Sequence, residues 1–185
     1  RFPIFPKIFR AFFARTDRFL MRFVDVIILP DDSRRKQIGL SSNENVVTII
    51  NTPPDIFSNN SVVPDSISEN FTIFYGGSTG VDRGTDIICK AVTNLSDVRL
   101  VIMGPCSAAY GERLKSICRN AQNIDLCLNW VLHEEIIRQA TTSDMLFAFY
   151  DPNIPNNKYA SPNKLFEAMM CSKPILVNDN TSMAE

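Results

Sequence analysis

Residues 160–178, A-S-P-N-K-L-F-E-A-M-M-C-S-K-P-I-L-V-N, combine a capped helix with a buried strand. Ser161 is a suitable N-cap because its hydroxyl can accept from an early helix amide, and Pro162 suits the first helical position, where an N–H is not needed. Lys173 and Pro174 would end this helix, and residues 175–177 have the unbroken apolar character of a buried strand. We therefore expect a helix over 161–171 that leads directly into a strand.

This predicted helix has one polar side and one apolar side. At about 100° per residue, Asn163, Lys164 and Glu167 fall within about a third of the circumference, and the opposite side carries Leu165, Phe166, Met169 and Met170. The positive end of the helix and Lys164 could hold an anion, which leaves Glu167 to accept from hydroxyl groups. A sugar nucleotide offers both a diphosphate and a ribose diol. The alternative interpretation is an ordinary surface helix with a capped start and solvated charges.

Length and composition indicate a folded globular protein. The chain has 185 residues, of which 45% are hydrophobic and 21% are charged. No apolar run is long enough to span a bilayer, and the N-terminus lacks the pattern of a signal peptide. Because the chain begins at Arg1 and no closing element follows the last predicted strand, we expect a fragment that is incomplete at both ends.

The cysteines and the single histidine argue against a disulfide framework and against a zinc site. The five cysteines are odd in number, and none forms a C-x-x-C pair, which favours reduced, mostly buried thiols in a cytoplasmic protein. His133 begins an H-E-x-x-H-like stretch, but Ile137 stands where the second histidine is needed. No D-x-D triplet occurs to hold a nucleotide-bound cation. We therefore expect no cofactor and no required metal.

Residues 1–23 are basic and rich in aromatic residues, whereas the rest of the chain is acidic. They contain six basic side chains, one aspartate and seven phenylalanines, so their net charge is +5 while the rest of the chain carries −6. A helical stripe of apolar residues comprises Ile4, Phe5, Ile8, Phe9, Phe12 and Phe13. Such a helix packs against another part of the protein, which we favour for a fragment, or makes peripheral contact with an anionic membrane on its cytoplasmic face.

The order of predicted elements indicates an α/β protein in two parts. Residues 1–50 contain strands at 24–29 and 46–50 with a short helix ending at Gly39, a typical C-cap; residues 51–70 are rich in Asn, Ser, Pro and Asp and read as a linker. Residues 71–185 alternate strands (71–75, 98–103, 124–128, 145–149 and 174–178) with helices (82–94, 108–120, 133–141 and 161–171). This alternation predicts a Rossmann-like parallel sheet with helices on both faces.

In such sheets, ligands bind beyond the carboxyl ends of the strands. Three segments are expected at that edge: the glycine-rich turn 76–84, the Gly104-Pro105 turn, and residues 159–167. The first is neither a P-loop nor G-x-G-x-x-G, but a glycine-rich turn that carries Arg83 lets backbone amides and a guanidinium approach a phosphate.

The segments in this order resemble the family 4 glycosyltransferases of the GT-B fold. The resemblance covers residues 24–185 and rests on V-D-V-I-I-L-P (24–30), I-I-N-T-P-P-D (49–55), F-Y-G-G-S-T-G-V-D-R-G-T-D (74–86), V-R-L-V-I-M-G (98–104) and S-P-N-K-L-F-E-A-M-M-C-S-K-P-I-L (161–176). It implies that residues 71–185 are most of a nucleotide-sugar-binding domain and residues 1–50 the end of an acceptor-side domain. The groups that the family uses for catalysis in its N-terminal domain would then lie outside this chain.

The resemblance also implies roles for individual residues. Glu167 stands at the position that holds the ribose, Asn163 and Lys164 stand beside the diphosphate, and Arg83 is the basic residue before a glycine. Tyr159 replaces a glutamate that faces the donor sugar, Ser78 replaces an arginine, and Ser172 stands where a glycine is usual. The donor-binding residues expected are Gly77, Ser78, Arg83, Tyr159, Ser161, Asn163, Lys164 and Glu167.

The function implied is that of a retaining glycosyltransferase in polysaccharide biosynthesis. It would transfer a sugar from a UDP- or GDP-sugar to a glycan, a lipid-linked acceptor or a small molecule, without a metal and without a nucleic-acid partner. The alternatives are a sugar-nucleotide epimerase of the same fold, and a non-catalytic nucleotide-binding subunit in which Tyr159 and Ser78 mark lost function. Whether the protein is a glycosyltransferase or an epimerase, we expect the isolated chain to be inactive and poorly soluble.

Overall fold

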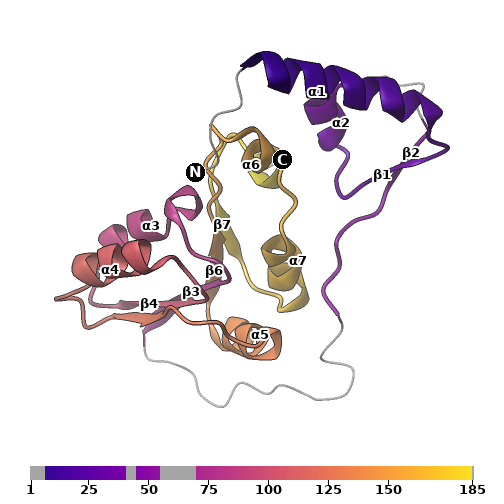
Figure 1. Ribbon diagram of the computed structural model, residues 1–185. Helices are drawn as coiled ribbons and strands as arrows, with labels where there is room; N and C mark the ends of the chain where they lie inside the picture. Colours follow the sequence, from indigo (N-terminus) through magenta and orange to yellow (C-terminus); the bar gives the residue numbers. More distant parts are fainter. Residues whose placement is uncertain (1–6, 41–44, 55–69, 185) are drawn as a thin grey trace. The chain divides into compact units, whose positions relative to one another are not determined.

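The computed structural model describes residues 7–40, 45–54 and 70–184 (Figure 1). The chain divides into two compact units, Arg1–Asn51 and Thr52–Glu185. Most of the predicted linker, together with the residues Ile4 and Phe5 of the apolar stripe, lies outside the described residues. No helix within the described ranges is both long enough and apolar enough to cross a bilayer.

The first unit is a small α/β arrangement. Its elements are α1 (Lys7–Leu20), a 3₁₀ turn (Met21–Phe23), β1 (Ile27–Leu29), α2 (Arg34–Ile38) and β2 (Val46–Thr48). The two strands pair in parallel, with Ile27 opposite Val46. Gly39 adopts a left-handed conformation and donates its N–H to the carbonyl of Arg35, which confirms the predicted C-cap of α2.

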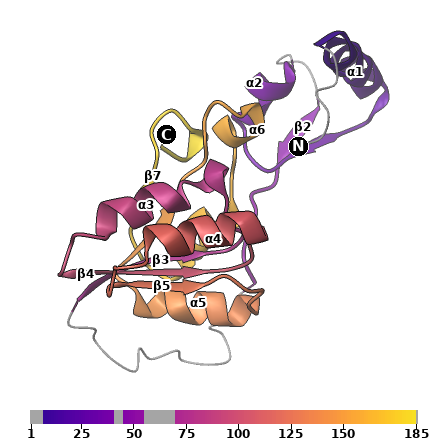
Figure 2. The same cartoon turned by 60° about the vertical axis from the view of Figure 1, so that its left-hand side comes forward.

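The second unit contains a five-stranded parallel sheet (Figures 1 and 2). Its strands are β3 (Phe71–Gly76), β4 (Val98–Met103), β5 (Ile124–Cys127), β6 (Met145–Ala148) and β7 (Ile175–Val177), in the spatial order β5-β4-β3-β6-β7. All five were predicted, because each is an apolar run bounded by polar or turn residues. The strand order reverses between β3 and β6, and in doubly wound sheets the ligand crevice forms at such a switch point.

Helices cover both faces of this sheet. They are α3 (Thr85–Val92), α4 (Ala108–Ile117), α5 (His133–Thr142), α6 (Pro155–Lys158) and α7 (Asn163–Met170). Figure 2 shows α3 and α4 on one face and α5 on the other. The predicted helix 82–94 is divided by Gly84 into a 3₁₀ turn (Val81–Arg83) and α3, and the short helix α6 was not predicted.

Alternate residues of each strand enter different core layers, as the pleat of a strand requires. On one face, Tyr75 of β3 and Leu100 and Ile102 of β4 pack with Cys89 of α3 and Leu114 of α4. On the other face the core contains Phe74, Val101, Ile137 and Ala168, which come from β3, β4, α5 and α7. The predicted sheet with helices on both faces is therefore confirmed, and each face has its own core layer.

Candidate functional site

A pocket of about 380 Å³ lies at the carboxyl edge of the sheet in the second unit. Its walls come from the turns after the adjacent strands β3, β4 and β5 and from the first turns of α5 and α7. The residues that line it are Gly76, Gly77, Ser78, Gly104, Pro105, Trp130, Val131, His133, Ile136, Asn163, Lys164 and Glu167. A volume of this order can hold a small organic ligand.

The turn after β3 passes so close to Lys164 that a side chain at Gly77 would displace the lysine ammonium group. Gly77 has a φ of +127°, and a Cβ atom placed there would lie 2.6 Å from the Nζ of Lys164. The turn is held by bonds from the Gly77 N–H to the Met103 carbonyl (2.8 Å) and from the Tyr75 hydroxyl to the Ser78 carbonyl (2.7 Å). The Gly77 amide is thus used inside the protein, and Lys164 supplies the positive charge at this wall.

Lys164 projects from the first turn of α7 into a confined, partly apolar position. Its Nζ lies 4.9 Å from the centroid of the Tyr75 ring, within the range of a cation–π interaction. Burial lowers the pKa of Lys164, the nearby Arg83 lowers it further, and Glu167 opposes both effects. A half-buried ammonium group of this kind would gain most from an anionic ligand.

Glu167 lies one helical turn after Lys164 and is 7% exposed. Its Oε1 is 3.8 Å from the Nε2 of His133, the first residue of α5. Burial raises the pKa of Glu167, while Lys164 and His133 each lower it in part. Across residues 7–40, 45–54 and 70–184, no three or more His, Cys, Asp or Glu side chains are grouped to hold a metal ion.

The start of α7 differs from the sequence prediction in one respect. The helix begins at Asn163, and Pro162 occupies the N-cap position with an extended backbone (φ −78°, ψ 149°), so no side chain caps the helix. The prediction that Ser161 is the N-cap was therefore wrong by one residue. Ser161 is buried and is absent from the pocket lining, whereas Asn163 is exposed and lines the pocket.

Arg83 and Tyr159 also lie outside the lining of this pocket. The guanidinium carbon of Arg83 is 4.0 Å from the centroid of the Tyr150 ring, and its Nη1 donates to the Asn157 side chain at 3.2 Å. The Nζ of Lys158 is 5.8 Å from the Tyr159 ring centroid. Five of the eight predicted residues thus meet in one pocket, namely Gly77, Ser78, Asn163, Lys164 and Glu167.

Four residues that line the pocket lie outside the predicted segments, and two of them, His133 and Trp130, have polar or aromatic side chains that could contact a ligand. His133 was considered only as a metal ligand, and Trp130 was not considered at all. Both belong to the segment after β5, a strand whose carboxyl end points to the same edge as those of β3 and β4. Extending the rule for parallel sheets to every strand would have found them.

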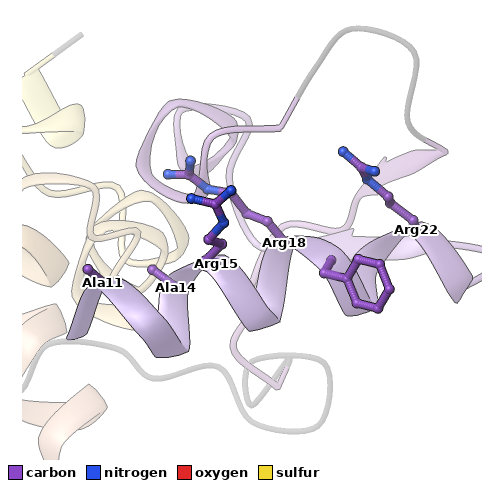
Figure 3. Close-up of a pocket in the computed structure, with 6 residues that line it drawn as sticks. Ala11, Ala14, Arg15, Arg18 and Arg22 are labelled. Atoms are coloured by element: carbon purple, nitrogen blue, oxygen red, sulfur yellow. The ribbon is translucent and has the colours of Figure 1, made fainter. Parts of the chain in front are cut away.

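The first unit presents a separate basic surface on α1. Arg15 and Arg18 of α1 and Arg22 of the following 3₁₀ turn extend to the same side around a shallow hollow (Figure 3). None of the three forms an ion pair with another residue in the described part of the chain. Phe19 lines the same hollow. The exposed aromatic side chains of this helix and the following turn are Phe9, Phe12, Phe13, Phe19 and Phe23.

No family model matches the chain, and no curated protein matches it significantly. Solved structures do match. The chain is similar to HepE of Anabaena in complex with UDP and glucose, at a TM-score of 0.67 and 15% identity over 92% of this chain and 49% of that one. It is also similar to AviGT4, a glycosyltransferase of avilamycin A biosynthesis (TM-score 0.59, 15% identity, 87% and 49% coverage). A third match is the lipopolysaccharide outer core galactosyltransferase WaaB (TM-score 0.60, 16% identity, 87% and 45% coverage).

These similarities concern the fold. The parallel sheet and its helices are those of GT-B glycosyltransferases, which confirms the predicted fold class. The chain spans about half the length of the structures that it matches, with 49% of HepE covered. Since one fold can support many activities, the function must be argued from the pocket.

Proposed function

We propose that this chain provides the donor-binding part of a nucleotide-sugar-dependent glycosyltransferase. The observation that carries the proposal is the placement of a cation and a carboxylate, Lys164 and Glu167, one helical turn apart in a pocket at the carboxyl edge of the sheet. A nucleoside diphosphate has the matching features: an anionic diphosphate beside a ribose diol.

The diphosphate would lie at the Lys164 wall. The Nζ of Lys164 occupies the space above Gly77, so an anion that enters between the turn and α7 meets the ammonium group directly. Asn163 precedes it at the start of the helix, where amide groups and the helix dipole also favour negative charge. Because Lys164 can neutralise part of the phosphate charge, we propose that donor binding does not need a metal.

The ribose would lie at Glu167. A carboxylate accepts hydrogen bonds from two vicinal hydroxyls, and such bonds to a charged acceptor are stronger than neutral ones. His133 lies against the same carboxylate and helps to hold it. The pocket thus has an anion-binding end and a hydroxyl-binding end in the order that a nucleoside diphosphate requires.

The finer features of the enzyme are proposals of the same kind. HepE, a protein with this fold, has been crystallised with UDP-glucose, and we propose a UDP- or GDP-sugar as donor here. We further propose a family 4 enzyme that acts with retention on a glycan or lipid-linked acceptor during polysaccharide synthesis in the cytoplasm. Peripheral contact with an anionic membrane through α1 is favoured by its exposed aromatic residues and its row of arginines.

The test is calorimetric binding of UDP, GDP, UMP and GMP to a protein that contains this chain and to its variants. Lys164→Ala should weaken the diphosphates about 10- to 100-fold, the range expected for a hydrogen bond to a charged group, and should affect the monophosphates less. Glu167→Gln should weaken all four. Lys90→Ala and Glu112→Gln, at exposed positions outside the pocket, are matched controls. Unchanged affinity in both pocket variants would refute the proposed site.

A second candidate is a non-catalytic nucleotide-binding subunit. It is favoured by Tyr159. By the resemblance to family 4 enzymes, this residue replaces the glutamate that faces the donor sugar, and it lies outside the pocket lining. Both candidates predict the binding results above, but only the enzyme predicts transfer of sugar to an acceptor. A protein that contains this chain and binds UDP without turning over any UDP-sugar would support the subunit.

A further inference from the structure

Tyr75 is a fully buried residue of β3 that touches two parts of the pocket wall from below. Its ring packs against the ring of Phe147, with 4.9 Å between the centroids. Its hydroxyl donates to the carbonyl of Ser78 at 2.7 Å, and the Nζ of Lys164 lies over its ring. Tyr75 is outside the lining of the pocket, whereas Ser78 and Lys164 belong to it. An effect of Tyr75 on a ligand is therefore carried by these two residues.

The hydroxyl of Tyr75 fixes the end of the turn that follows its own strand. The turn is held at Gly77 by the bond from its N–H to the Met103 carbonyl and at Ser78 by the bond from Tyr75. Ser78 is exposed to solvent, so the phenol, and not the surrounding core, sets the position of its carbonyl. Burial raises the pKa of Tyr75, which keeps its hydroxyl protonated and able to donate.

The ring of Tyr75 acts on the ammonium group of Lys164. The Nζ lies 4.9 Å from the ring centroid and fills the space where a Cβ atom of Gly77 would be. Burial and the charge of Arg83 lower the pKa of Lys164, and Glu167 raises it. The face of an aromatic ring attracts a cation, most strongly where water is excluded. Tyr75 therefore favours the charged lysine and holds it against the turn.

We propose that Tyr75 is a positioning residue, which holds the Lys164 ammonium group and the glycine-rich turn in the arrangement that receives the diphosphate. This inference rests on the proposed function, because it takes Lys164 as the group that meets the diphosphate. The ammonium group stays on the ring when the ligand enters, and its other side meets the phosphate. A cation that is already in place loses little freedom on binding, which favours affinity.

The first test removes the hydroxyl and keeps the ring. Tyr75→Phe, in a protein that contains this chain, should weaken UDP and pyrophosphate equally by roughly 2- to 10-fold in calorimetry, because it frees the Ser78 carbonyl. Tyr110→Phe is the matched control: this tyrosine is also buried, its hydroxyl is 2.9 Å from that of Thr85, and it is outside the pocket lining. The control should leave both affinities unchanged.

The second test weakens the ring as a partner of the cation and keeps its shape. Phenylalanine with an increasing number of ring fluorines is placed at position 75, because fluorine withdraws electrons from the face that attracts the ammonium group. The affinities for UDP and pyrophosphate should fall stepwise, by about 2- to 30-fold in all. The pKa of Lys164 in the free protein, followed by NMR of its labelled ε-carbon, should fall in parallel, which a role in packing alone would not cause. The same series at Phe74, the preceding residue of β3, is the control because this side chain packs in the other core layer.

The outcomes separate this inference from the proposed function. UDP binding that depends on Lys164 but is the same in Tyr75→Phe and in the fluorinated series overturns the positioning role and leaves the proposed function standing. Tighter binding on fluorination would show that the ring competes with the phosphate for the ammonium group, which also overturns it. Failure of the unaltered protein to bind UDP and pyrophosphate overturns both.

Discussion

The Nε2 of His133 lies 3.8 Å from the Oε1 of Glu167, and this contact joins the first turn of α5 to the first turns of α7. Glu167 is 7% exposed, so its ionisation depends on the few charges that reach it. Burial raises its pKa, and Lys164 and His133 limit the rise. Lys164 and His133 thus offset part of the effect of burial on the carboxylate that would bind the ribose.

This arrangement predicts that nucleotide affinity falls at both acidic and alkaline pH. Because the pKa of Glu167 is raised, its carboxylate is lost at a higher pH than an ordinary glutamate, which titrates near about 4.3. Because the pKa of Lys164 is lowered, its charge is lost at a lower pH than in an ordinary lysine. The UDP affinity measured by calorimetry across pH should therefore show a maximum between these two limits.

Two variants test whether Glu167 causes the acidic decline. His133→Gln removes a basic group that lowers the pKa of Glu167, so the acidic decline should begin at a higher pH. Glu167→Gln should leave only the decline that comes from protonation of the phosphate itself, which has a pKa near about 6. Identical acidic profiles in the original chain and in both variants would contradict a role for Glu167 in binding.

The fold could be read from the sequence because each strand of the second unit is a short apolar run and each helix carries an apolar face. The residues of α7 show why part of the site was also predictable: Lys164 and Glu167 are fixed on one side of a helix by its period alone. A helix that follows a strand of a parallel sheet begins at the carboxyl edge of that sheet, so both residues are brought to this edge. These two steps need no tertiary contacts.

The remaining features depend on contacts between distant segments. The contacts of Arg83 could not be predicted, because its partners Tyr150 and Asn157 lie 67 and 74 residues further along the chain. Ser161 is a good cap by residue type, but the backbone places Pro162 at that position. Trp130 carries no local pattern, and its place in the pocket follows only from the order of strands in the sheet.

The contacts of Arg83 predict an effect of Arg83→Ala on stability. The substitution removes the stacking on Tyr150 and the bond to Asn157, and it should lower the free energy of unfolding by about 1–2 kcal/mol. The ion pair with Asp82 (3.5 Å) should add little, because Asp82 is partly exposed. Urea unfolding measures the change. Arg83→Lys, which keeps the charge but cannot stack in the same way, should recover less than half of it. Weaker UDP binding with unchanged stability would instead favour the phosphate role.

Ser172 predicts a gain in stability. It follows α7 with a φ of +54°, a left-handed conformation that a residue with a Cβ adopts at a cost. Ser172→Gly should raise the free energy of unfolding by about 1 kcal/mol, without any effect on UDP affinity, because Ser172 lies outside the pocket lining. Ser172→Ala is the control: it keeps the Cβ and should bring no gain. An equal gain in both variants would show that the backbone conformation is not the cause.

The last prediction separates the two interpretations of α1. If its arginines bind a bilayer, vesicle association of the chain should require anionic lipid and should weaken steeply with salt, because charges exposed to solvent are screened. Replacing Arg15, Arg18 and Arg22 by serine should reduce association about a hundredfold, at about 1 kcal/mol for each basic residue near the surface. The same change at Lys90, Lys115 and Arg119, exposed residues of the second unit, is the control. Association that is absent, or that does not depend on salt, would leave packing against another part of the protein as the explanation of the exposed phenylalanines. The arginines would then make contacts within the first unit. Arg18 already does so, because its guanidinium lies beside Gly39 at the end of α2.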